Sequence, residues 1–116
     1  MRLKLIAMLV LLLTVEQCIA ARVDIKADIG QIRYHEATNT MGAPYQKTVW
    51  FALANPDVAS SCPKFDSNIL VIFPDTDQAA LSMILMAKAA NKRVWVTLDD
   101  SALMLGYCKL QYLTLL

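Results

Sequence analysis

The segment from Asp75 to Leu98, DTDQAALSMILMAKAANKRVWVTL, constrains the fold more than any other part of the chain. It predicts an almost wholly apolar helix with Asp75 as its N-cap, followed directly by a β-strand. Gln78 stands three residues after Asp75, the spacing of a capping box, and Asn91 suits the left-handed backbone that ends many helices. A helix this apolar must be covered on more than one side.

Alternating apolar residues predict strands before and after this helix. The five predicted strands are 22–35, 48–54, 69–73, 93–99 and 107–116. Gly30 interrupts the first of them, which predicts a bulge or bend. Three strands, a helix and two strands is the order of a small five-stranded Greek-key barrel, the OB-fold. We therefore expect a mainly β domain over residues 21–116, with one helix and the order β-β-β-α-β-β.

The same patterns divide the side chains between core and surface. Trp50 and Trp95 are predicted to point outward, and Asp99–Gly106 is predicted to be a connecting loop. The residues predicted to lie in the core are Val49, Phe51, Leu53, Val94, Val96, Leu98, Leu110, Leu113 and Leu115. The helix residues predicted to plug one end of the barrel are Ala80, Leu81, Ile84, Leu85 and Ala87.

The first 20 residues have the three parts of a cleaved secretory signal peptide. A cationic start precedes the apolar run 5–15, and a polar region ends in small residues, with cleavage expected after Ala20. The run is shorter than the roughly 20 apolar residues of a membrane span. We expect an exported protein, periplasmic or secreted, with no membrane span after cleavage.

Export gives the cysteines a simple interpretation. The chain has three cysteines, and removal of Cys18 with the leader leaves Cys62 and Cys108. An even pair in an exported domain predicts a structural disulfide, with a reduced pair or an intermolecular bridge as the alternatives.

Charge and motifs argue against several functions. Without Arg2, Lys4 and Glu16, the 11 basic and 10 acidic residues of the chain become nine of each, so the domain lacks the basic surface that nucleic acids require. His35 is the single histidine, which gives neither a two-histidine metal site nor a recognisable nucleophile pair. We expect no catalytic residues, metal or other cofactor, and therefore not an enzyme.

Aromatic residues are the strongest candidates for a binding role. Trp50, Trp95, Tyr34 and Tyr45 lie on outward strand positions or near the long loop 36–47. Such rings stack on sugars, anchor protein interfaces, or pack beneath a loop, and the sequence leaves these alternatives open. On the helix, Met83 and Met86 leave little polar surface, so either a second subunit or the loop 55–68 is expected to cover them.

The block ALSMILMAKAANKRVWV and the closing GYCKLQYLTL resemble small exported bacterial OB-fold proteins related to the B subunits of AB toxins, of the subtilase-cytotoxin and pertussis-like kind. The resemblance spans residues 29–116 and departs from the family at Asn91, where glycine is usual. It implies export, a disulfide, pentamers in which the helix lines a pore, and glycan binding. The family's sugar-contacting residues do not map onto this chain. The expected function is thus a self-associating glycan-binding module, with a monomeric periplasmic protein-interaction or inhibitory module as the alternative.

Overall fold

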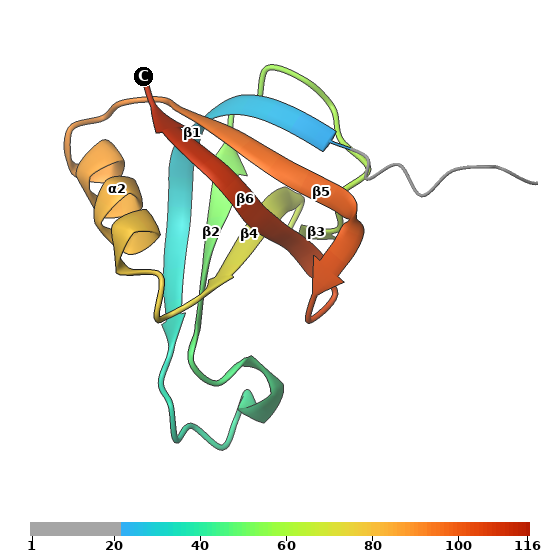
Figure 1. The fold of residues 1–116 in the computed structure, drawn as a ribbon, viewed down its shortest axis with the longest axis vertical. Coiled ribbons are helices and arrows are strands. Elements are labelled where there is room, and N and C mark those ends of the chain that lie inside the picture. The colour runs from blue at the N-terminus through green and yellow to red at the C-terminus, as the bar shows by residue number, and fades with distance from the viewer. Residues whose placement is uncertain (1–21) are drawn as a thin grey trace, which may run out of the picture.

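A long first strand organises the sheet by pairing with two different neighbours (Figure 1). The computed structural model describes residues 22–116, so the predicted signal peptide lies outside the described residues. The first half of β1 (Arg22–His35) pairs antiparallel with β5 (Val94–Met104), and its second half pairs antiparallel with β2 (Thr48–Ala54). One strand therefore serves both halves of the sheet.

The predicted bend in β1 is present at Gly30. The register with β2 shifts between Ile29 and Ile32, so two residues of β1 stand opposite Ala52 alone. A Cβ atom on Gly30 would lie 3.1 Å from the Ala52 carbonyl oxygen, which is tighter than an ordinary contact. Glycine allows the two backbones to approach this closely.

The remaining strands connect β2 back to β5. The strand β4 (Asn68–Pro74) pairs with β2 antiparallel and with β6 (Tyr107–Leu115) in parallel, and β6 pairs antiparallel with β5. A two-residue strand, β3 (Lys64–Phe65), extends the sheet beyond β4. The described residues thus form a mainly β domain of six strands in one sheet with a single α-helix.

Two details of the strands differ from the predictions. The short β3 lies within a segment expected to be a loop. The strand β5 continues to Met104 instead of ending at Asp99, and Leu105 and Gly106 alone connect it to β6. Both connecting residues have positive φ, 52° and 86°, as a tight two-residue hairpin turn requires. A leucine in this backbone region is an unusual turn signal, so the pattern predicted a longer loop.

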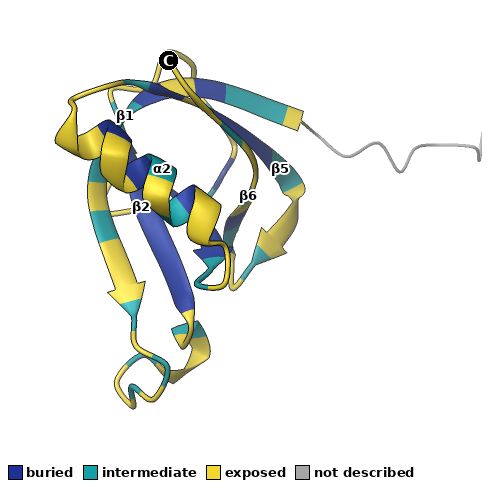
Figure 2. Cartoon of the chain, turned by 60° about the vertical axis from the view of Figure 1, so that its left-hand side comes forward, coloured by how far each residue is buried: buried dark blue, intermediate teal, exposed yellow. Residues whose placement is uncertain are grey.

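The single α-helix, α2 (Gln78–Ala89), lies across the sheet with one side buried (Figure 2). Its N-cap is Asp77, whose carboxylate accepts a hydrogen bond from the Ala80 amide at 3.2 Å, so the predicted cap at Asp75 was wrong by two residues. At the other end, Asn91 has the predicted left-handed backbone, and the Lys92 amide donates to the Ala87 carbonyl. This pairing is the Schellman motif.

The main core lies between α2 and the inner face of the sheet. It includes every predicted core residue of β2 and β5, together with Ala80, Ile84 and Ala87 of the helix. Leu81, Leu110 and Leu113 pack against it in part. Leu85 and Leu115 are exposed instead, because Leu85 faces away from the sheet on α2 and Leu115 stands at the end of β6. The predicted disulfide between Cys62 and Cys108 is present, with both residues buried in this core.

Candidate binding site

A cleft of about 200 Å³ opens on the outer face of β2 and β4. Its walls come from several separate segments, so it exists only in the folded chain. Four aromatic rings, a histidine and an arginine dominate its lining. The lining residues are Arg33 and His35 of β1, Gly42 and Tyr45 of the following loop, Trp50 of β2, Phe65 of β3, Leu70 of β4 and Tyr107 of β6.

Trp50 forms the floor of this cleft. It points away from the main core, as predicted, and belongs to a second apolar cluster with Ala52, Leu70 and Ile72. Only 4% of its surface is exposed, because Tyr45 and the hairpin residues Met104 and Tyr107 pack over this cluster. An outward position on a strand therefore does not mean a solvent-exposed ring here.

The loop between β1 and β2 supplies one wall. A short 3-10 turn, Ala43–Tyr45, contains Pro44 and places the Tyr45 ring near His35, with the two ring centroids 5.4 Å apart. The Thr48 hydroxyl donates a hydrogen bond to the Tyr45 carbonyl and lies 3.4 Å from His35 Nδ1. These contacts attach the loop to the start of β2, so the wall has a defined position.

The opposite wall is made by β3 and the β5–β6 hairpin. The rings of Phe65 and Trp50 lie 6.1 Å apart at an interplanar angle of 53°, a tilted contact within the usual range for aromatic pairs. Phe65 is half-exposed, so one face of its ring is available to a ligand. Tyr107 directly precedes the disulfide cysteine Cys108, which connects this wall to the core.

The Arg33 guanidinium lies over the indole ring of Trp50. Arg33 is the direct cross-strand partner of Trp50, and its guanidinium carbon lies 4.7 Å from the centroid of the indole ring. This distance is typical of a cation–π pair. Within residues 22–116, Arg33 makes no ion pair and no side-chain hydrogen bond.

A second hollow of about 420 Å³ adjoins the cleft and shares Arg33, His35 and Gly42 with it. Tyr34, Glu36, Asn39 and Met41 complete its lining. Hydrogen bonds within the loop fix its shape: the Glu36 carboxylate accepts from the Thr38 amide and hydroxyl, and Asn39 Oδ1 accepts from the Gly42 amide. The hydrogen bonds from Thr38 lower the pKa of Glu36, because they stabilise its ionised carboxylate. That carboxylate is therefore already hydrogen-bonded within its own loop.

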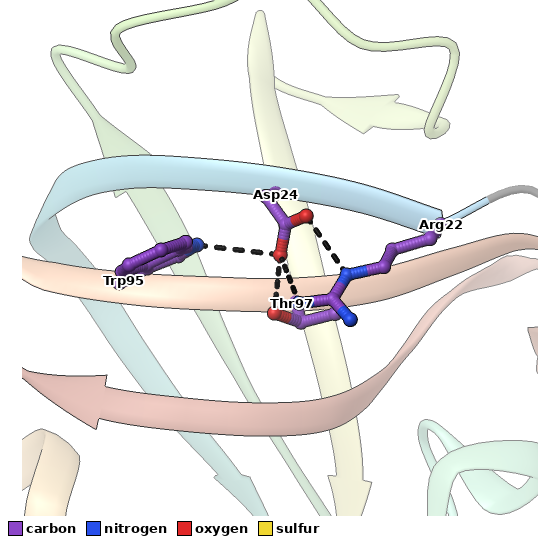
Figure 3. A network of polar contacts seen from close by, with 4 residues as sticks. All are labelled: Arg22, Asp24, Trp95 and Thr97. Atoms are coloured by element: carbon purple, nitrogen blue, oxygen red, sulfur yellow. Dashed lines mark hydrogen bonds and ion pairs between the residues drawn. The ribbon is translucent and has the colours of Figure 1, made fainter.

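The fourth predicted residue, Trp95, also points away from the main core, but it lies over β1 and β5 and away from the cleft (Figure 3). Its indole N–H donates to Asp24 Oδ1 at 3.3 Å, and the Thr97 hydroxyl donates to the same oxygen at 2.6 Å. Arg22 Nε donates to Asp24 Oδ2 at 2.9 Å, and hydrogen bonding by Arg22 and then Thr97 lowers the pKa of Asp24. Trp95 is 38% exposed and lines neither the cleft nor the hollow.

The structure therefore groups three of the four predicted residues. Tyr45 and Trp50 line the cleft, and Tyr34 lines the adjoining hollow. The sequence patterns did not indicate Arg33, His35, Phe65 or Tyr107 as residues of a binding site. The pairing of the first two predicted strands contained a signal for Arg33, because a hairpin register that sets Tyr34 beside Val49 sets Arg33 beside Trp50.

Comparison with known proteins finds no family model, curated protein or solved structure that matches the chain. Over residues 22–116, none of the helices is long and apolar enough to cross a membrane. The same residues contain no group of three or more histidine, cysteine, aspartate or glutamate side chains that could hold a metal ion.

Proposed function

We propose that this chain is an exported, non-catalytic binding module with an OB-type barrel, and that the cleft over Trp50 binds a sugar ring of a glycan. The strand pairings support the barrel. Pairing runs from β2 through β1, β5, β6 and β4 and returns to β2, with the helix between the third and fourth of these five strands in chain order. This is the connectivity expected of a five-stranded Greek-key barrel.

The place of the cleft supports the binding role. In OB-folds, ligands bind on the face of the second and third barrel strands, beside the loops that follow the first and fourth strands. Here the corresponding elements are β2, β4, the loop 36–47 and the Leu105–Gly106 turn. The cleft lies against the first three of these and against Tyr107, which directly follows the turn.

The lining of the cleft is the observation that carries the proposal. Aromatic faces contact the apolar faces of sugar rings, while a few polar groups orient the hydroxyls. Tyr45, Phe65 and Tyr107 provide such faces, and Arg33 and His35 provide polar groups in the lining. A volume of about 200 Å³ is below the roughly 300–1,000 Å³ of sites that enclose drug-sized ligands, and fits one ring.

We further propose that the protein is exported and that copies of it self-associate. Disulfides persist in oxidising compartments, and the predicted signal peptide would direct the chain to such a compartment. Met86 is 57% exposed beside the half-exposed Leu85 on α2, so the described chain leaves this apolar side of the helix uncovered. We propose that copies associate through α2, with Met83 and Met86 at the contact, as in the pentamers of AB toxin B subunits.

A glycan screen with matched variants tests the binding role. The oxidised mature protein is applied to an array of neutral and acidic oligosaccharides, alongside Tyr45→Ala, Phe65→Ala and Tyr112→Ala. Tyr112 is a well-exposed tyrosine on β6 outside the cleft, so its variant is the control. We expect the first two variants to lose glycan retention and the control to keep it. Equal retention by all three variants, or no retention by the parent, would contradict sugar binding in the cleft.

Light scattering on a sizing column tests self-association separately. A pentamer that dissociates in Met86→Lys while circular dichroism stays unchanged would support association through α2. A monomeric parent would exclude it and would favour a single-chain binder.

A further inference from the structure

His35 lies between the cleft and the adjoining hollow and lines both. Its ring centroid is 5.4 Å from that of Tyr45 and 6.3 Å from that of Trp50. Within residues 22–116, the one hydrogen-bond partner of the ring is the Thr48 hydroxyl, 3.4 Å from Nδ1. We infer that Thr48 holds the neutral imidazole in the tautomer protonated on Nδ1. We infer further, on the basis of the proposed sugar-binding function, that Nε2 is the hydrogen-bond acceptor that meets the bound sugar.

The direction of the hydrogen bond between Thr48 and His35 follows from the number of protons available. A hydroxyl has one hydrogen to donate and two lone pairs with which to accept. The Tyr45 carbonyl has no hydrogen, so Thr48 is the donor in the bond between these two groups. The Thr48 oxygen can therefore only accept from His35, and Nδ1 has to carry a proton. With the proton on Nε2 instead, two lone pairs would face each other across this contact.

Burial of Thr48 makes this arrangement effective. The residue is 3% exposed, so water has little access to its hydroxyl. Leaving a shielded polar group without a hydrogen-bond partner has a free-energy cost, which here falls on the tautomer protonated on Nε2. The hydrogen bond made by one ring nitrogen commonly decides which of the two is protonated. Thr48 is thus a positioning residue for the proton of His35.

The opposite edge of the imidazole ring faces the site. A Cβ atom on Gly42 would lie 3.8 Å from His35 Cδ2, the carbon next to Nε2, and Gly42 lines both the cleft and the hollow. In the part of the chain that the structure describes, no side chain hydrogen-bonds to Nε2. With Nδ1 protonated, Nε2 has a lone pair and no hydrogen. A sugar hydroxyl or amide N–H can donate to this atom, whereas an ether oxygen cannot.

The single histidine of the chain makes its tautomer directly measurable. In 15N-labelled protein, a protonated ring nitrogen resonates far upfield of one that has a free lone pair. A long-range 1H–15N correlation spectrum, recorded at a pH above the end of the histidine titration, therefore shows which nitrogen carries the proton. We expect Nδ1 to be protonated and Nε2 to be unprotonated in the oxidised mature protein without any ligand.

Variants of Thr48 test whether its hydroxyl sets this tautomer. Thr48→Val has a similar shape without the hydroxyl and is expected to shift the proton toward Nε2. Thr48→Ser keeps the hydroxyl and is expected to give the spectrum of the parent. Thr97→Val is the matched control, because Thr97 is also buried and its hydroxyl donates to Asp24, away from the cleft. Circular dichroism checks that each variant is folded.

The role of Nε2 toward a sugar is measured with the glycan that the parent retains most tightly on the array. Its affinity for Thr48→Val is expected to fall about twofold to tenfold, the effect of one neutral hydrogen bond. Thr48→Ser and Thr97→Val should bind this glycan as the parent does. In the parent, the same glycan should move the 15N resonance of Nε2 upfield, because a donor then occupies its lone pair.

Each contrary result has a distinct meaning. Protonation of Nε2 in the parent would overturn the inference, whether or not Thr48→Val folds. A spectrum of folded Thr48→Val identical to that of the parent would overturn the role of Thr48. The expected spectra with unchanged glycan affinity in Thr48→Val would overturn the role of Nε2 and leave sugar binding in place. If the parent retains no glycan, the proposed function fails and the role of Nε2 fails with it, whereas the spectra still decide the tautomer.

Discussion

Reduction of the Cys62–Cys108 disulfide is expected to remove a large share of the stability of the domain. The bridge joins residues 46 positions apart. In the chain-entropy model, closing a loop of that length lowers the entropy of the unfolded chain by about 13.5 cal/mol/K, which corresponds to about 4 kcal/mol at 25 °C. Small domains have a total unfolding free energy of only about 5–15 kcal/mol, so the change is readily measured.

The assay is urea unfolding of the predicted mature form, residues 21–116, which contains these two cysteines and no others. Unfolding is followed by circular dichroism with and without a phosphine reductant. The Cys62→Ala/Cys108→Ala variant is the control. Its urea midpoint should be the same with and without the reductant and should lie near that of the reduced parent. A loss below about 1 kcal/mol in the reduced parent would refute the reasoning, because the unfolded chain would then gain little freedom.

Three smaller effects follow from individual residues. Ser67 has a φ of 67° in the two-residue β3–β4 turn, so Ser67→Gly should raise the unfolding free energy by about 0.5–1 kcal/mol, whereas Ser101→Gly within β5 should lower it. Asn91 has a φ of 53°, so thermal melts should show Asn91→Gly more stable and Asn91→Val less stable than the parent. The hydrogen bond from Arg22 lowers the pKa of Asp24 in the folded state. The ionised Asp24 carboxylate therefore stabilises the fold fully above its unfolded-state pKa of about 3.9, and this stabilisation is lost as the pH falls through the folded-state pKa. Acid unfolding of Asp24→Asn should therefore depend less on pH below about pH 4 than that of the parent.

Much of the strand and helix layout could be predicted because local patterns specify it. Alternation identified β1 and β2 with their observed ends, and the apolar run of α2 identified the helix. Gly30 marked the bulge because a glycine weakens the interior of a strand and is typical of positions where the strand bends or another backbone approaches closely. The end of β5 was missed, because Leu105 gives no sign of the positive φ that its turn requires.

The cleft was only partly predictable, because it forms from segments that are distant in the sequence. The aromatic residues Tyr45 and Trp50 were evident as candidates, but their neighbours depend on how the loop 36–47 and the β5–β6 hairpin fold over β2. Burial of Trp50 is a consequence of this tertiary packing. No local pattern records which residues cover an outward strand position.

The parallel pairing of β4 with β6 also sets the order in which the chain can fold. β6 follows all the other described strands, yet it lies between β4 and β5 in the sheet. Until residues 107–115 are available, β4 lacks one neighbour, β5 can pair only with β1, and Cys62 has no partner. Such non-local pairing slows folding and leaves strand edges exposed meanwhile. A chain shortened before Tyr107 would therefore keep most of its apolar residues but would present open edges for aggregation.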